Sequence, residues 1–377
     1  MLLGFQVYEL THNPLDLGWL GLAEAAPGIA LVLYGGHVAD RLPRRRIVLL
    51  GTAAMALLAA ALTAASGSGH ALPVLFAAAV LTGAIGAFAD PALSGLEAHV
   101  VPVAGLLRGL ALLATTGRTA TMLGPALGGL AWAALGPSKT YAGLAALFIA
   151  SVTVMAAGVP EVPPPQPTEN GAGVWQSIRE GVAFVFRSEV LLGSMALDLF
   201  AVFFGGATAL LPVFATDILG AGPAGFGLLR SAGAAGSLTA AAFATRLVPP
   251  RWAGLVLHGV IAGFGVAMVL FGLSRSLPLS VAALFVAGLC DGVSVVIRRA
   301  ILRLASPEAM RGRIAAVRLI FLSSSNELGA FESGVAASLL GAPAAVWAGG
   351  LVTLGVVVAT ALRAPGLRRL DLEALGR

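Results

Sequence analysis

An internal repeat at a constant spacing of 205 residues constrains the fold of this chain most. The repeat has five matches: residues 39–42 with 244–247, Gly83 with Gly288, Pro102 with Pro307, Arg108 with Arg313, and residues 123–129 with 328–334. No insertion or deletion interrupts the spacing, so chance is a poor explanation for it. The repeat predicts two similar halves of the same architecture.

The composition indicates what kind of halves these are. Hydrophobic residues make up 58% of the chain and charged residues only 11%, whereas a soluble domain carries about 25% charged residues. The apolar residues form blocks of about 20, long enough to cross a hydrocarbon core of roughly 30 Å as helices. The expected fold class is therefore all-α integral membrane, and a soluble enzyme is excluded. Two parallel membrane halves form the plan of one large class of secondary transporter.

Eleven complete spans are expected, and a shorter apolar segment precedes them. They lie at residues 19–39, 47–67, 73–93, 106–134, 140–159, 191–214, 223–245, 252–273, 277–298, 314–338 and 343–362. Residues 1–10 are apolar but reach only about 15 Å as a helix, half a bilayer. The repeat pairs this segment with the span at 191–214, so we expect the first span to be incomplete in this chain.

The arginines predict the orientation, because cytoplasmic loops carry an excess of Lys and Arg. Arginines crowd one set of loops and the C-terminal tail, and the opposite loops hold only Lys139 and Arg275. The arginine-rich side and the C-terminus are therefore expected in the cytoplasm, in a plasma (inner) membrane. The expected domains are an N-terminal bundle at 1–160, a linker with a surface helix at 161–190, a C-terminal bundle at 191–363 and a cytoplasmic tail at 364–377. Because the basic residues lie between spans, no nucleic-acid partner is expected.

Ionisable residues inside the spans are costly and usually face the protein interior. They are Glu24, Asp90, Arg118, Asp198, Arg230, Asp291, Arg318, Glu327 and Glu332. Counting the first fragment as span 1, they leave spans 3, 6, 9 and 12 uncharged. This period of three predicts that every third helix faces lipid and that the others line a central path.

A loop motif between the second and third spans carries a family resemblance. Its members include Gly36, Asp40, Arg41, Arg44 and Arg45. A solvated basic loop would explain the arginines alone, but the Gly-x-x-x-Asp-Arg spacing favours a specific joint between helices. The motif resembles the signature of the major facilitator superfamily, from which it departs at Val38 and Pro43. The resemblance implies two six-helix bundles and a cytoplasmic latch between the halves, with Asp90 as the acidic partner of the arginines.

Two further motifs point to one branch of that family. Gly124, Pro125, Gly128 and Gly129 resemble the antiporter motif of drug-exporting members, although an ordinary kinked packing helix is the alternative. Residues 311–317 and 325–329, with Ser333 and Gly334, look like the branch of enterobactin-exporter-like and macrolide-efflux-like proteins. The resemblance implies a small-molecule substrate, such as a drug or a siderophore, and a monomer.

The energy source is expected to be an ion gradient, because the chain has no phosphate-binding Gly-x-x-x-x-Gly-Lys loop and its only lysine is Lys139. No cofactor or metal cluster is expected. A proton-coupled exporter needs a carboxyl group that gains and loses a proton as its surroundings change. Glu327 is the first candidate because it lies near mid-membrane, as Arg118 does in the equivalent span. Asp198 and Glu24 follow.

Each charged residue also has a structural reading. Arg230 could simply neutralise Asp198, and Arg298 and Arg299 are expected to extend toward the membrane surface. The phenylalanines at 200, 203, 204, 321 and 331 could line a cavity for amphipathic molecules. The leading hypothesis is a proton-coupled exporter of amphipathic small molecules that works by alternating access. The alternatives are an uncoupled facilitator or importer of a small solute, and a membrane scaffold or sensor that does not transport.

Overall fold

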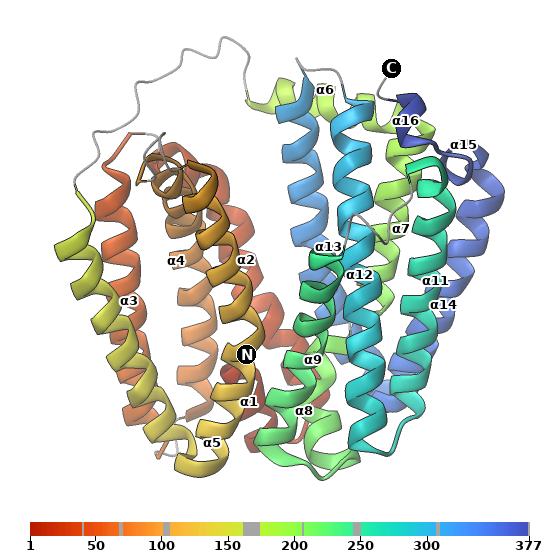
Figure 1. Ribbon diagram of the computed structural model, residues 1–377. Coiled ribbons are helices and arrows are strands. Elements are labelled where there is room, and N and C mark those ends of the chain that lie inside the picture. Colours follow the sequence, from red (N-terminus) through yellow and green to blue (C-terminus); the bar gives the residue numbers. More distant parts are fainter. Residues whose placement is uncertain are drawn as a thin grey trace. The chain divides into compact units, whose positions relative to one another are not determined.

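Helices make up the secondary structure of the residues that the structure describes, and the expected all-α membrane fold is confirmed. The structure is a computed structural model, drawn in Figure 1. It describes residues 1–39, 41–67, 71–100, 106–160, 174–205, 207–243, 250–306 and 310–375. Within these ranges it leaves out the side chains of residues 33, 98, 99, 106–108, 110, 174–178, 181, 205, 250, 311–313, 315–324, 327, 374 and 375. The chain divides into two compact units, Met1–Glu169 and Asn170–Arg377.

The first unit contains five described helices. They are α1 (Leu2–Thr11), α2 (Pro14–Ala39), α3 (Arg44–Ala65), α4 (Ala71–Val100) and α5 (Leu106–Gly158). The long helix α5 consists of two membrane-length limbs, because Gly136 has a φ of 76° that interrupts the helix. Pro137 follows directly, and its missing N–H is tolerated in the first turn of a new limb. The spans expected at 106–134 and 140–159 are these two limbs.

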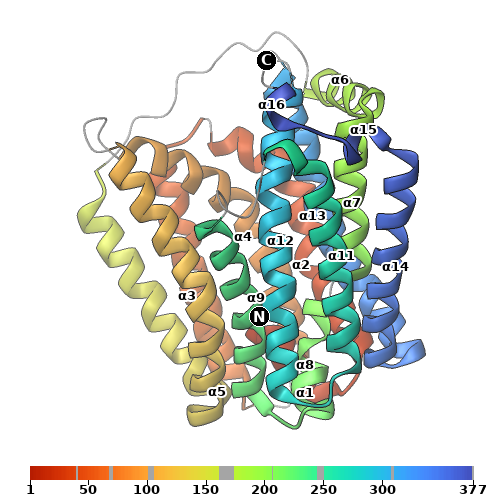
Figure 2. The ribbon, with the colours of Figure 1, turned by 45° about the vertical axis from the view of Figure 1, so that its right-hand side comes forward.

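The second unit contains the remaining helices. The membrane-length ones are α7 (Glu189–Gly205) with its continuation, α9 (Gly222–Ala242), α11 (Ala253–Leu273), α12 (Leu277–Ala305), α13 (Arg311–Leu340) and α14 (Ala342–Arg363). The short ones are α6 (Val174–Arg187), η4 (Pro250–Trp252), α15 (Pro365–Arg368) and α16 (Leu372–Leu375). Figures 1 and 2 both show α6, α15 and α16 at the same end of the long helices of this unit.

The span that begins with α7 is not one regular helix. After α7 the chain forms a 3-10 turn η2 (Ala207–Leu210), a short α8 (Leu211–Val213) and a π-helical turn η3 (Phe214–Ile218). Pro212 lies in this stretch, and proline cannot donate the backbone hydrogen bond that a regular helix requires. The span expected at 191–214 therefore exists, but its last third passes through 3-10, α and π turns instead of continuing as one α-helix.

Close glycine contacts repeat in both units at the spacing of 205 residues. A Cβ atom added to Gly83 on α4 would overlap the carbonyl oxygen of Glu24 on α2. A Cβ atom added to its repeat partner Gly288 on α12 would overlap the carbonyl oxygen of Gly233 on α9. Glycine at these positions lets two helix backbones touch, as is usual for packing in lipid. The sequence repeat is thus also a repeat of helix packing.

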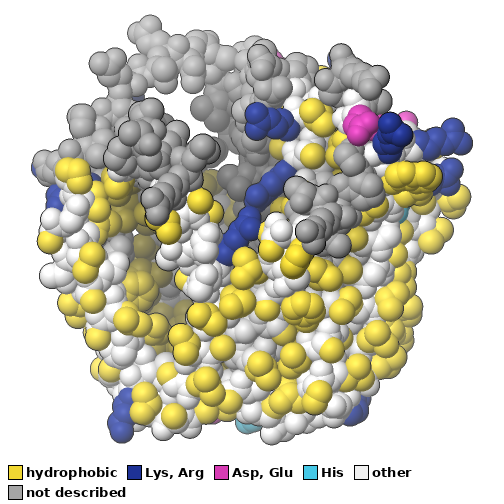
Figure 3. All heavy atoms as spheres, viewed as in Figure 1, with side chains coloured by type: hydrophobic (Ala, Val, Ile, Leu, Met, Phe, Trp, Pro, Cys, Tyr) yellow, Lys and Arg dark blue, Asp and Glu magenta, His cyan; other side chains and the backbone are white. Residues whose placement is uncertain are grey.

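The surface is that of a membrane protein. Eight helical stretches of the described chain are long and apolar enough to cross a membrane, and one of them, Ala111–Gly158, covers both limbs of α5. In α13 the described apolar stretch is Leu328–Leu340. Figure 3 shows hydrophobic side chains over the middle of the face in view and Lys and Arg side chains mainly near its upper and lower edges.

The segment after α14 packs back onto the second unit. Leu367 is fully buried and Leu370 is 6% exposed. The backbone N–H of Gly366 donates to the Glu189 carboxylate at the start of α7 over 2.8 Å, and the N–H of Gly254 donates to the Leu370 carbonyl oxygen over 3.3 Å. The segment therefore covers the ends of α7 and α11.

Candidate functional site

The arginines of the loop motif connect three helices of the first unit. Nη1 of Arg44 donates to the carbonyl oxygen of Gly95 over 3.2 Å, and Nη2 of Arg45 donates to that of Ala156 over 2.6 Å. Ala156 lies in the last turn of α5, where helix carbonyls lack intrahelical partners and favour a cation, and Gly95 lies five residues before the end of α4. The start of α3 is thereby fastened to both helices.

The other members of the predicted gating motif have fewer contacts in the described structure, or lie outside it. Asp40 lies outside the described residues. Arg41 is exposed, and Gly36 has open space where a Cβ atom would lie. Asp90 is exposed and makes no ion pair with any described residue, so the expected pairing with the arginines stays a prediction.

The glycines of the antiporter-type motif differ in their surroundings. A Cβ atom added to Gly128 would lie 3.4 Å from Cε of Met1, an ordinary contact distance, so the start of the chain packs against the first limb of α5 at this glycine. Gly129 is buried, whereas a Cβ atom on Gly124 would meet nothing within 4 Å. Pro125 lies inside the helix between them.

The ionisable residues that the first unit carries in its spans are exposed. Glu24 on α2 and Arg118 on α5 make no ion pair or hydrogen bond through their side chains with any described residue. Neither side chain is covered by a partner within the described chain.

Three charged residues meet inside the second unit. Nη1 of Arg298 on α12 forms an ion pair with Oδ1 of Asp198 on α7. Nη2 of Arg298 lies 3.7 Å from Oδ1 of Asp291, which is two helical turns earlier on α12. The side chains of Arg298 and Asp198 are 6% and 10% exposed, whereas that of Asp291 is 45% exposed. We call Asp198, Arg298 and Asp291 the charged triad.

The charged triad corrects two expectations. Arg298 does not extend to the membrane surface, because its guanidinium is held between two carboxylates. Asp198 pairs with Arg298, and no ion pair within the described chain joins it to Arg230, which is exposed. Sequence reasoning placed Arg298 at the membrane surface because the expected span ends at residue 298, whereas α12 continues to Ala305. The spacing of seven residues from Asp291, which puts both on one helix face, was the available signal.

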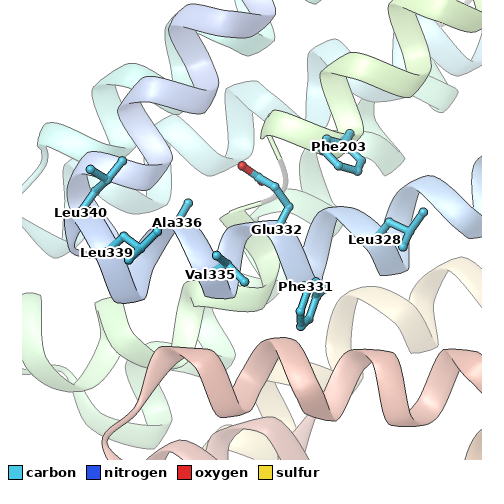
Figure 4. A pocket seen from close by; sticks show the side chains of 8 residues that line it. All are labelled: Phe203, Leu328, Phe331, Glu332, Val335, Ala336, Leu339 and Leu340. Carbon is cyan, nitrogen blue, oxygen red and sulfur yellow. The ribbon is translucent and has the colours of Figure 1, made fainter.

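A cavity of about 570 Å³ lies beside α13 in the same unit. Its lining residues are Phe203, Leu328, Phe331, Glu332, Val335, Ala336, Leu339 and Leu340. Figure 4 shows Glu332 projecting from α13 on the side where Phe203 of α7 lies. Among the lining residues that the structure describes, Glu332 is the one ionisable group, and the others are apolar. Of the expected candidates, Glu327 and Arg318 have side chains that are not described.

Close approach of two helices places Phe203 at this cavity. A Cβ atom added to Gly329 on α13 would lie 2.9 Å from the carbonyl oxygen of Phe203, so only glycine allows α7 so near. The ring of Phe203 packs edge-on against that of Phe204 at 4.9 Å, and Phe204 stacks on Phe200 at 6.2 Å. The aromatic residues of α7 therefore form a continuous row that ends at the cavity.

Comparisons with known proteins bear on this arrangement. The family model described as Major Facilitator Superfamily matches residues 2–274. The enterobactin exporter EntS of Shigella flexneri is 28% identical over 315 residues, which cover 82% of this chain and 73% of the relative. The multidrug efflux pump Tap of Mycobacterium tuberculosis (strain ATCC 25618 / H37Rv) is 28% identical over 370 residues, which cover 93% of this chain and 85% of the relative.

Solved structures agree on the fold. The peptide transporter POT in complex with sulfate superimposes with a TM-score of 0.73 at 15% identity, covering 98% of this chain and 92% of that one. The human organic anion transporter MFSD10 superimposes with a TM-score of 0.59 at 18% identity, covering 91% and 83%. At these identities the likeness shows the fold alone.

Proposed function

The chain belongs to the Major Facilitator Superfamily and is an integral multi-pass membrane transporter, not an enzyme, and from this premise we propose that it exports amphipathic small molecules in exchange for protons. The export direction is supported by the two relatives, one a siderophore exporter and the other a drug efflux pump. The antiporter-type motif at Gly124, Pro125, Gly128 and Gly129 supports the same direction. Alternating access between the two halves would carry the solute across the membrane.

The charged triad is the observation that carries proton coupling. One guanidinium faces two carboxylates, so the cluster holds one negative charge more than it can neutralise internally. Excess charge in a medium of low polarity is costly, and a carboxyl group relieves it by taking up a proton. Asp291 is the member that can exchange that proton with water, because its side chain is far more exposed than that of Asp198.

Other ionisable groups on the helices that pack against α12 do not neutralise this excess within the described chain. On α11, Nδ1 of the buried His258 lies 2.7 Å from the carbonyl oxygen of Gly254 in its own helix. On α9, Arg230 is exposed and makes no described ion pair. On α13, Glu332 is a further carboxylate, and the side chains of Arg318 and Glu327 are not described. We retain Glu327, Arg118, Glu24, Arg230 and Glu332 as path candidates.

Coupling by Arg298 follows from the same geometry. When Asp291 is protonated, its attraction for Arg298 weakens and the ion pair with Asp198 remains. When Asp291 loses its proton, both carboxylates attract the guanidinium, and α7 and α12 are pulled toward a different arrangement. Proton release and helix movement are then linked, as alternating access driven by a proton gradient requires.

Proton movement in proteoliposomes tests the proposal. The purified chain is reconstituted with a pH-sensitive dye inside the vesicles, and cationic dyes, macrolides and catecholates are added under an imposed pH gradient. We expect substrate-dependent proton flux in the wild type and at least a tenfold loss of it in Asp291→Asn, with downhill solute flux retained. Asp217→Asn, a substitution of an exposed acid away from the triad, serves as the matched control and should behave as the wild type.

The result also separates the alternatives. If solute flux does not depend on the pH gradient, the result would favour an uncoupled facilitator over a proton-coupled exporter. Failure of the wild type to move any compound of the panel would favour a membrane scaffold or sensor. Coupling that survives in Asp291→Asn would remove the triad from the mechanism.

A further inference from the structure

The helix α6 has one face that the described part of the second unit leaves uncovered. Its exposed residues are three or four positions apart and so share one side of the helix: Arg179, Ala183, Phe186 and Arg187. On the other side, Val185 is buried in the core of the unit and Val182 packs against the same core. We propose that the uncovered side, which we call the basic face of α6, binds the phosphate groups of anionic lipids. The inference goes beyond the proposed export, because it holds whatever solute the chain carries.

The position of α6 at the membrane decides which partner its basic face meets. Ser188 alone separates α6 from α7, and the membrane-length stretch that contains α7 starts at Glu189. Two residues span at most about 7 Å, and the headgroup layer is roughly 5–7 Å thick on each side of the hydrocarbon core. Arg187 is therefore at the level of the headgroups. Figures 1 and 2 both show α6 lying across the ends of the long helices of this unit, so the rest of the face stays near that level.

The charge of the basic face selects anionic lipids. Neither Arg179 nor Arg187 makes an ion pair or a side-chain hydrogen bond with any described residue. Glu180 at the edge of the face is partly buried, so two positive charges outnumber one negative charge. A guanidinium group binds phosphate through two parallel N–H donors. The arginine-rich side of the chain is also the side expected to face the leaflet that holds anionic lipids.

An aromatic ring in the same face distinguishes a lipid from a soluble partner. The side chain of Phe186 is exposed although it is large and apolar, with 59% of its surface accessible. Helices that lie in a membrane surface carry such residues, because the ring enters the boundary between headgroups and acyl chains. An acidic protein would match the charge of the face but not its level at the membrane. The combination of two arginines with a phenylalanine at headgroup level therefore fits an anionic bilayer surface.

Fluorescence quenching in vesicles tests the proposal on the full-length chain. In a Cys290→Ser background, Ala183→Cys carries a bimane label in the middle of the basic face. The protein is reconstituted in phosphatidylcholine that contains equal fractions of either brominated phosphatidylglycerol or brominated phosphatidylcholine, since bromine quenches a label that it contacts. We expect the relative association constant at the label to favour phosphatidylglycerol at least fivefold, because one basic residue beside an anionic surface contributes about that factor.

Two double variants that lower the net charge equally separate the basic face from the overall charge of the protein. Arg179→Gln with Arg187→Gln should bring the preference close to one. Lys139→Gln with Arg275→Gln changes the exposed basic residues of the opposite loops and should retain the preference. Phe186→Ser should lower quenching by both lipids and leave their ratio unchanged.

Three results would overturn the proposal. They are equal quenching by both lipids in the labelled protein with its arginines intact, a preference that survives the loss of Arg179 and Arg187, and little quenching by either lipid. The last result would show that the face lies away from the bilayer, against a protein partner or a second copy. No solute or proton moves in this measurement, so its outcome is independent of whether the chain exports in exchange for protons.

Discussion

Arg298 faces two carboxylates, and removing it would take away the cation that pairs with both in the described part of the chain. Asp198 is the more affected, because its side chain is only 10% exposed. Removing one partner of a buried ion pair typically lowers the free energy of unfolding by about 3–5 kcal/mol, because the remaining charge is left buried and unpaired. We expect Arg298→Ala to destabilise the protein by that order, measured as a lowered midpoint of thermal unfolding in detergent.

The neighbouring Arg299 provides the control for that measurement. It is exposed, so Arg299→Ala should change stability by no more than about 0.5 kcal/mol. The double variant Asp198→Asn with Arg298→Gln should recover part of the loss, because it removes the charge as well as its partner. Equal effects of Arg298→Ala and Arg299→Ala would contradict the pairing.

At the residue scale the sequence named most of the charged positions but few of their partners. Asp198 and Asp291 stand out because they are charged and lie inside apolar spans. Arg298 does not, since it is the last residue of its expected span and a basic residue in that position usually reaches the membrane surface. Which carboxylate it meets depends on how α7 lies against α12, and that is a property of tertiary packing that local pattern does not encode.

At the scale of helices, the glycine contacts set how closely α9 and α12 approach. We expect Gly288→Ala to destabilise the protein by about 1–3 kcal/mol, because the added methyl group overlaps the Gly233 backbone. Gly259→Ala on α11 should be neutral or slightly stabilising, since a Cβ atom there meets nothing within 4 Å and alanine favours helix. Thermal unfolding of the two variants side by side checks this, and a stable Gly288→Ala protein would show that the helices can part without loss.

The segment after α14 is predicted to be structural as well. Deleting residues 364–377 should lower the unfolding midpoint, because burial of a leucine stabilises by about 1.5–3 kcal/mol and two leucines are buried there. Arg251→Ala should have little effect, since its ion pair with Glu373 at 3.4 Å is largely exposed. If the deletion were silent and Arg251→Ala were not, the tail would be held by its surface charges instead.

The spans themselves were predictable, because their apolar blocks match the length of a bilayer. The break at Gly136 was predictable for the same reason, as the polar interruption there separates two such blocks. The sequence did not predict the 3-10 and π turns that follow α7. Pro212 marks it, but proline alone does not say whether a membrane helix kinks, ends or adopts a π turn.

For the whole molecule, the arginine distribution predicts that the C-terminus lies in the cytoplasm. Cys290 is the only cysteine, so Cys290→Ser gives a background without thiols. On that background we expect Asp217→Cys to react with a membrane-impermeant maleimide in intact cells and Glu373→Cys to react only after permeabilisation. The opposite labelling pattern would show that the orientation is the reverse of the predicted one and would contradict the proposed direction of export.

The glycine contacts shared by the two units bear on how the repeat arose. If one ancestral half was duplicated, the α2–α4 and α9–α12 contacts are older than the duplication, because Gly28, Gly83, Gly233 and Gly288 correspond at 205 residues. The charges in the spans do not follow the repeat. Their counterparts at the same spacing are all uncharged: Leu229 for Glu24, Val295 for Asp90, Ser323 for Arg118, Gly86 for Asp291, Leu93 for Arg298, Met122 for Glu327 and Leu127 for Glu332. The two halves therefore share these helix contacts but not the positions of these intramembrane charges.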